Sequence, residues 1–217
     1  VEAWANLARS ALEPNVFYEP WLLLPALRHL GAGADLRFAL AYAPDPGRPH
    51  GPPVLCGFFP LERRRGYKGL PVSYLALWKH RYCSLGTPLV RAGCARACLE
   101  AFLDWLAGAA DGSSLVELPF VTGEGPFHQA WTGLLDRRER PAFVHEHFTR
   151  AFFEPAADAE AYLSAALAAK RRKELRRKEK RLGELGRLEY RTLAPDGDAA
   201  AWIEGFLGLE ARGWKGE

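Results

Sequence analysis

The sequence lacks methionine altogether, and it also lacks any apolar run long enough to span a bilayer. Because a native reading frame begins with Met and this chain begins with Val1, we expect that residues are missing upstream. The longest strongly apolar run, at 21–27, contains Pro25 and falls far short of the ~20 residues that a transmembrane helix needs. No charged-then-apolar segment opens the chain, so we expect no secretory signal.

Cysteine is scarce, and its four positions, Cys56, Cys83, Cys94 and Cys98, form no CxxC pair. A structural zinc site needs further Cys or His residues at close spacing, which this sequence does not supply. We therefore expect the cysteines to act as small buried hydrophobic residues, and we expect no metal ion. Free thiols without a leader favour a reducing, cytoplasmic location.

The positive charge is concentrated in one segment. The 217 residues carry a formal net charge of only +3. Residues 170–181 hold nine Lys or Arg and two Glu, so this segment alone carries +7 and the remainder of the chain carries −4. Any anion-binding surface is therefore expected to be local. The 48% hydrophobic content is ample for a folded core.

Apolar periodicity predicts alternating helices and strands. Helices are expected near 4–12, 20–30, 94–107, 124–137, 158–183 and 198–212, with Asp158 and Asp198 as N-caps. Strands are expected over 36–42, 54–62, 70–77, 113–120, 142–154 and 188–193. A basic turn at 63–69 would join the second and third strands in a hairpin. This order predicts an α/β fold with a mixed sheet.

Four strings carry a family resemblance. They are Asn-Val-Phe-Tyr-Glu-Pro-Trp-Leu at 15–22, Gly-Thr-Pro-Leu-Val at 86–90, Lys-Arg-Arg-Lys-Glu-Leu-Arg-Arg at 170–177 and Phe-Leu-Gly-Leu-Glu-Ala-Arg-Gly-Trp-Lys-Gly at 206–216. With the order of elements, they make the chain resemble acyltransferases of the GNAT superfamily that contain two such units in tandem, as the Fem peptidoglycan transferases do. The strings are most similar to a bacterial branch associated with cellulose biosynthesis.

The resemblance implies a GNAT-like acyl-CoA N-acyltransferase fold. Residues 1–154 would form a first unit lacking only its first strand, and 158–217 a basic linking helix plus the first strand and helix of a truncated second unit. It implies transfer of an acetyl or other acyl group from acyl-CoA to an amine or hydroxyl. The acceptor it implies is a small molecule or a saccharide, related to a polysaccharide or to the cell envelope, and it leaves the oligomeric state open.

The CoA-binding loop of the family, Arg/Gln-x-x-Gly-x-Gly/Ala, is missing where the fold would place it, at 78–93. Such a loop holds the pyrophosphate on backbone N–H groups at a helix start. The nearest string, at 63–69, has the wrong glycine spacing and is followed by a strand. The first unit is therefore not expected to bind CoA, the second unit would bind it beyond Glu217, and this chain alone is expected to be inactive. The catalytic residue remains unassigned.

Two segments are candidates for substrate binding. The irregular connection after the third strand gathers Lys79, His80, Arg81 and Tyr82, and binding residues favour such loops. A solvated loop is the alternative. Near the end of the chain, Lys215 could pair with an anionic acceptor and Trp214 could stack on a sugar ring. The alternative there is a helix end closed by Gly213, with Trp214 in the core.

The basic segment 170–181 has three readings. Its Lys and Arg side chains could form a solvated helix face, or they could line the groove that a phosphorylated substrate enters. The anion-binding candidates among them are Arg171, Arg172, Arg176 and Arg177. A non-enzymatic binding module for nucleic acid or anionic membrane is the alternative function. Nucleic acid is the less favoured partner, and the absence of aromatic side chains interleaved with the arginines counts against recognition of a single strand. Peripheral membrane contact stays open.

Overall fold

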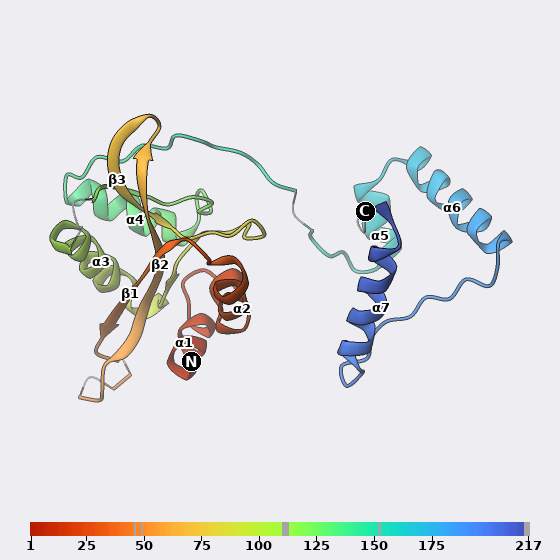
Figure 1. The fold of residues 1–217 in the computed structure, drawn as a ribbon, viewed down its shortest axis with the longest axis horizontal. Coiled ribbons are helices and arrows are strands. Elements are labelled where there is room, and N and C mark those ends of the chain that lie inside the picture. The colour runs from red at the N-terminus through yellow and green to blue at the C-terminus, as the bar shows by residue number, and fades with distance from the viewer. Residues whose placement is uncertain (46, 49, 110–112, 152, 215–217) are drawn as a thin grey trace. The chain divides into compact units, whose positions relative to one another are not determined.

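The chain forms two compact units, Val1–Glu146 and His147–Glu217, in a computed structural model (Figure 1). The structure describes residues 1–45, 47–48, 50–109, 113–151 and 153–214. Unit 1 contains a mixed sheet covered by helices, and unit 2 contains helices. The mixed α/β class predicted from the sequence is thereby confirmed for unit 1.

The sheet of unit 1 is built around one long strand. The main strands lie in the order β1-β2-β3-β5, and the short β4 pairs with β2 beyond the end of its contact with β3. Pairing is antiparallel except between β3 and β5, which are parallel and joined through a helix. The strands are β1 (Asp35–Ala43), β2 (Val54–Tyr67), β3 (Leu70–Leu77), β4 (Leu89–Val90) and β5 (Ser113–Glu117).

Helices cover this sheet over two separate hydrophobic clusters. One cluster packs α3 (Ala95–Ala109) and α4 (Pro126–Arg137) against β2 and β3, and Phe59 stacks there on Phe102 at 3.8 Å between ring centroids. The other packs α1 (Glu2–Arg9), the 3-10 turn η1 (Val16–Tyr18) and α2 (Pro20–Leu30) around Phe58. A second 3-10 turn, η2 (Ala92–Cys94), leads into α3. Since neighbouring strand residues point to opposite faces, Phe58 and Phe59 serve one cluster each.

Several element boundaries follow from signals that the sequence displays. Pro20 and Pro126 occupy first-turn positions of α2 and α4, where a missing N–H costs nothing. The hairpin between β2 and β3 is present, but β2 runs on to Tyr67, so the basic residues 63–65 belong to the strand. The turn is confined to Lys68 and Gly69, both at positive φ.

The strand expected at 142–154 is absent from the part of that segment that the structure describes, 142–151 and 153–154. The segment alternates in pattern, and His145 lies 3.9 Å from Glu117 of β5, but no backbone ladder forms. Phe143 is 89% exposed as a result. Alternation identifies a segment able to form a strand, whereas a strand also needs a neighbouring edge to pair with.

Unit 2 consists of α5 (Ala159–Ala166), α6 (Ala169–Glu184) and α7 (Ala199–Ala211). Asp158 and Asp198 cap α5 and α7 as expected, accepting hydrogen bonds from the backbone N–H groups of Ala161 and Ala201. The single helix expected over 158–183 is divided by extended backbone at Leu167 and Ala168. The strand expected at 188–193 does not form.

The helices of unit 2 bury none of their described side chains. The large apolar side chains of α7 are exposed: Trp202, Ile203, Phe206, Leu207 and Leu209. Leu175 and Leu182 of α6 are exposed as well. Helical spacing located these apolar residues correctly within helices, but spacing does not supply the surface that would cover them.

Gly57 lies beside a β-bulge in β2, at a point where neighbouring side chains leave no room for a Cβ atom. The pairing of β2 with β1 shifts at Ala41 and Tyr42, so Cys56 is the extra residue of the bulge. The Sγ atom of Cys98 on α3 lies where a side chain at position 57 would begin, with the Phe59 ring beside it. All four cysteines are free and buried, as expected.

Replacing Gly57 with Ala should destabilise the protein by about 1–3 kcal/mol, because an added methyl group would overpack this site. Urea unfolding followed by circular dichroism measures the change. Gly108→Ala is the matched control, since a Cβ there meets no atom within 4 Å and α3 should gain up to about 1 kcal/mol. Equal effects of the two substitutions would contradict the packing argument.

Candidate functional site

A polar cavity of about 390 Å³ lies in unit 1 beside the end of β3. It brings together the turn between α2 and β1, two residues of β2 and the four residues that follow β3. The lining residues are Leu30, Ala32, Gly33, Ala34, Glu62, Arg64, Trp78, Lys79, His80 and Arg81. Three of the four loop candidates from the sequence therefore line one cavity, whereas Tyr82 does not.

The loop that carries these candidates is anchored by residues of the segment 15–22, the first of the four strings that carry the family resemblance. The buried Tyr18 hydroxyl donates a hydrogen bond of 2.8 Å to the carbonyl oxygen of Trp78. Asn15 is 1% exposed, and its amide donates to the carbonyl oxygens of Leu85 and Thr87 at 3.2 and 2.7 Å. Two buried polar side chains thus fix both ends of the loop on the core.

The cations of the cavity differ in what already holds them. Arg64 forms a two-pronged ion pair with Glu62, at 2.8 and 2.6 Å, so its charge is largely balanced. The Lys79 ammonium lies 4.0 Å from the ring centroid of Phe120, in a cation–π contact. The Arg81 guanidinium lies 5.4 Å from the ring of Tyr82. Neither Lys79 nor Arg81 pairs with a carboxylate among the described residues, which leaves the cavity a net positive charge.

His80 has one nitrogen engaged and one buried nitrogen with no partner. Its Nδ1 accepts a hydrogen bond of 3.2 Å from the backbone N–H of Tyr82, so the proton of the neutral ring is assigned to Nε2. That Nε2 atom is inaccessible to solvent and has no hydrogen-bond partner among the described residues. Burial lowers the pKa of His80, which keeps the ring neutral at pH 7. An unsatisfied donor of this kind favours a ligand that brings an acceptor.

Glu62 and Arg64 are cavity residues that the sequence reasoning missed. They lie two apart on β2 and hence on one face of the strand. This spacing was available in the sequence, but the predicted strand ended at Glu62 and Arg64 was assigned to the basic turn that follows it. The α2–β1 turn, with Gly33 at a positive φ of 80°, carried no recognisable signal.

The second pair of substrate-binding candidates lies elsewhere. Trp214 is 81% exposed in unit 2, so the alternative in which it fills a core is wrong. Lys215 lies outside the described residues. The cavity in unit 1 includes neither of them.

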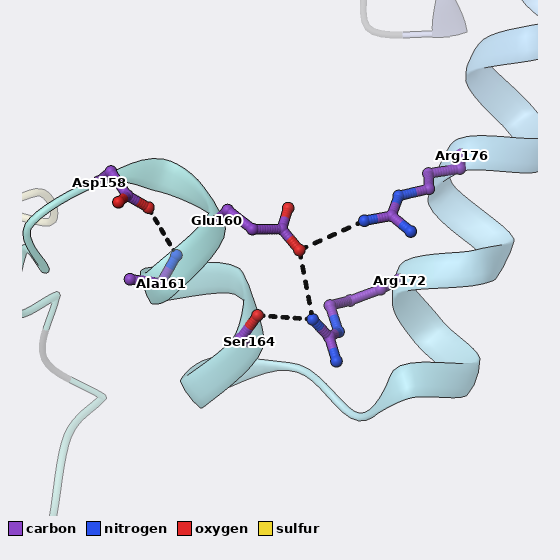
Figure 2. Close-up of polar contacts among 6 residues, drawn as sticks. All are labelled: Asp158, Glu160, Ala161, Ser164, Arg172 and Arg176. Carbon is purple, nitrogen blue, oxygen red and sulfur yellow. Dashed lines mark hydrogen bonds and ion pairs between the residues drawn. The ribbon is translucent and has the colours of Figure 1, made fainter.

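The basic candidates of α6 are mostly engaged in ion pairs within unit 2. Figure 2 shows Glu160 of α5 between Arg172 and Arg176 of α6, at 3.5 and 3.3 Å, while Arg172 also donates to Ser164 at 2.6 Å. Glu174 binds Arg171 at 2.8 Å and Lys178 at 3.1 Å. Hydrogen bonds from Lys178 and Arg171 hold the pKa of Glu174 below its usual value.

Of the four arginine candidates, Arg177 alone has no ion-pair partner in the described part of the chain. The break at Leu167 lets α6 fold back so that Glu160 reaches residues twelve and sixteen positions away. Local helical propensity predicted one continuous helix. The structure instead has two helices, α5 and α6, and the ion pairs of Glu160 join them across the break.

No family model, curated protein or solved structure matches the chain. Among the described residues, no group of three or more His, Cys, Asp and Glu side chains could hold a metal ion. The helices of that same part of the chain are all too short or too polar to cross a membrane.

Acidification should destabilise the protein in part through His80. An unfolded histidine titrates near pH 6.5. Because the folded-state pKa is lower, the unfolded chain binds the proton first as pH falls, so stability is lost below about pH 6.5 and regained above it. Urea unfolding at pH 7.5 and 5.5 should show a smaller pH dependence for His80→Gln than for the parent. His50→Gln, in an exposed loop, is the control and should leave the pH dependence as it is.

Tyr18→Phe should loosen the loop without altering the shape of the core. The ring stays in place, but the Trp78 carbonyl loses its buried donor, which costs about 1–3 kcal/mol. Hydrogen exchange of the backbone amides in 78–88 should accelerate. Tyr42→Phe on exposed β1 is the control, and exchange should not change there. Unchanged exchange in Tyr18→Phe would mean that other contacts hold the loop.

Proposed function

We propose that the chain takes part in acyl transfer from acetyl-CoA or another acyl-CoA to an amine or hydroxyl, as a GNAT-type enzyme. In this proposal unit 1 shapes the acceptor site and the cavity beside β3 receives the acceptor. The linking helix and the residues after it would belong to a second unit that binds the acyl-CoA.

The observation that carries the proposal is the topology of unit 1. A GNAT unit without its first strand follows the order α α β β β α β α β. Unit 1 has the order α1, α2, β1, β2, β3, α3, β5, α4, with the two-residue β4 added before α3. An antiparallel β1-β2-β3 meander followed by a helical crossover to a parallel β5 supports a relation to that fold. The last strand of the order is missing from the described residues, so the support covers eight of nine elements.

The backbone at Arg91 and Ala92, at the end of the connection where the fold would place the CoA-binding loop, supports the view that unit 1 itself does not bind CoA. A pyrophosphate site there would need free N–H groups. The N–H of Arg91 donates to the Cys56 carbonyl at 2.8 Å, and the N–H of Ala92 donates to the Ser10 carbonyl at 3.1 Å. The Arg91 guanidinium turns toward Leu55, Ser10 and Asn6 and does not face a ligand.

The chemistry of the cavity supports an acceptor that carries an anionic group. Lys79 and Arg81 supply positive charge that no described carboxylate balances, and His80 offers an unsatisfied N–H. A phosphate or carboxylate would pair with Lys79 and Arg81, since its oxygens accept charge-assisted hydrogen bonds, whereas the inaccessible Nε2 atom of His80 would have to move to meet it. These residues would bind and orient the acceptor, and no described residue is assigned as the general base.

The proposal predicts that acyl-CoA raises the melting temperature of the chain when it is purified with any residues its gene encodes on either side. Release of free CoA thiol should follow when an acceptor is added. Among probes, glucosamine 6-phosphate should be used with a lower KM than glucosamine, because its phosphate can enter the cationic cavity. The absence of both a thermal shift and CoA release with acetyl- and longer acyl-CoAs would refute the proposal.

Arg81→Gln tests the acceptor cavity separately. The KM for the phosphorylated probe should rise at least tenfold, since a hydrogen bond to a charged group contributes about 1.5–3 kcal/mol, and acyl-CoA binding should not change. Arg28→Gln is the control, because Arg28 is exposed on α2 and does not line the cavity. Acyl transfer that is indifferent to Arg81→Gln would retain the enzyme class and exclude this cavity as the acceptor site.

A further inference from the structure

The unpaired cations of α6 gather on one face of the helix. Ion pairs with Glu160 and Glu174 engage four of its nine Lys and Arg residues in 170–181. The other five have no carboxylate partner in the described part of unit 2, and all are exposed. They are Lys170, Lys173, Arg177, Lys180 and Arg181, which we call the α6 cationic stripe.

Helix geometry places these five residues together. At 3.6 residues per turn, their positions fall within an arc of about 100° around the helix axis. The four paired cations fall outside that arc on both sides. With a rise of 1.5 Å per residue, the stripe extends about 16 Å along α6; its charges are about 4–6 Å apart along the axis, except for the adjacent Lys180 and Arg181. Glu184, at the C-terminal end of the same arc, is the one acidic residue that the helix places there.

From this arrangement we infer that the α6 cationic stripe binds the phosphate backbone of a duplex nucleic acid without reading its sequence. One strand of B-DNA presents a phosphate every 3.4 Å or so along the helix axis. A row of about 16 Å therefore spans roughly five phosphates, as many as the cations of the stripe. The inference is independent of the acyl-transfer proposal, because it rests on unit 2 alone.

A membrane surface fits α6 less well than a duplex. A helix that lies in a bilayer interface inserts an apolar face and places its cations beside that face. The large apolar residues of α6, Leu175 and Leu182, project on the side of the helix opposite the stripe, roughly 150° or more from its centre. The leucines and the stripe therefore cannot both meet one membrane surface.

A single strand also fits less well, because stacking platforms are missing. Proteins that bind single strands alternate cations with aromatic rings on which bases stack. No aromatic residue occurs within α6. The nearest along the chain, Tyr190, is engaged by Glu179 at 2.8 Å. Backbone phosphates are then the part of a nucleic acid that α6 can recognise.

The full chain should bind a duplex of about 20 base pairs and random sequence, and its affinity should fall as salt rises. Fluorescence anisotropy between about 50 and 200 mM NaCl measures this dependence, because phosphate contacts weaken strongly over that range. The plot of log K against log salt should have a slope of about −4.5, because each of the five neutralised phosphates contributes about −0.9. Neutralising the whole stripe with five Gln substitutions should abolish binding.

A pair of double variants separates the stripe from net charge. Lys173→Gln with Arg177→Gln removes two stripe cations, and Arg171→Gln with Lys178→Gln removes two paired cations. Both leave the contacts of Glu160 intact and change the net charge equally. The stripe variant should lower the steepness of the slope by about 2 and the affinity at least tenfold, while the control stays within about threefold.

Three outcomes would overturn the inference. The first is no binding to the duplex by the parent chain, and the second is equal losses in the two double variants. The third is binding to vesicles rich in phosphatidylserine, or to a single strand, that exceeds binding to the duplex and depends on the stripe. Circular dichroism of every variant at the helical minima checks that α6 remains folded. If α6 unfolds in the variant with five substitutions, the comparison of the two double variants decides the test.

Discussion

Unit 1 depends on β2, because this one strand pairs with three others and separates two hydrophobic cores. Phe58 faces the core under α1 and α2, and Phe59 faces the core under α3 and α4. The strand then continues beyond the cores, where side chains need no burial, and presents Glu62 and Arg64 to the cavity. The rigid part of the strand thus fixes the position of a polar site at its other end, which is the arrangement that precise binding requires.

Unit 2 is held by a different kind of interaction. Its helices bury no described side chain, so capping by Asp158 and Asp198 and the ion pairs of Glu160 and Glu174 are the contacts that define it. Exposed ion pairs contribute only about 0–1 kcal/mol each and weaken in salt, and a helix cap adds about 1 kcal/mol. These contacts specify how α5 and α6 meet more than they stabilise the unit. The apolar side chains of α7 are exposed, so they add little of the stabilisation that burial of apolar surface provides elsewhere in the chain.

The sequence predicted those features that depend on neighbours along the chain. Pro20, Pro126, Asp158 and Asp198 each act within one helical turn, and the helices that they begin are present. Features that depend on a distant partner were less accessible. The described parts of the segments 142–154 and 188–193 have the pattern of strands but pair with no neighbouring strand, and α6 is separated from α5 by a break across which Glu160 makes its contacts. For the cavity, the sequence identified the loop candidates. It did not predict that Asn15 and Tyr18 hold that loop, because these two residues lie some 60–70 residues away along the chain.

Counting charges along the sequence could not identify the cations that are available to a ligand. The segment 170–181 carries +7 as a sum, yet three of the four arginines singled out from it are committed to Glu160 or Glu174. The same distinction applies in unit 1, where Arg64 is held by Glu62, while Lys79 and Arg81 each lie against an aromatic ring and pair with no carboxylate among the described residues. A cation already paired must lose its partner before it can bind an anion, whereas an unpaired cation gives up only water. Spatial pairing, rather than charge density, therefore decides which cations are available to an anion. In unit 1 it excludes Arg64 and retains Lys79 and Arg81, and among the four arginine candidates of unit 2 it retains Arg177.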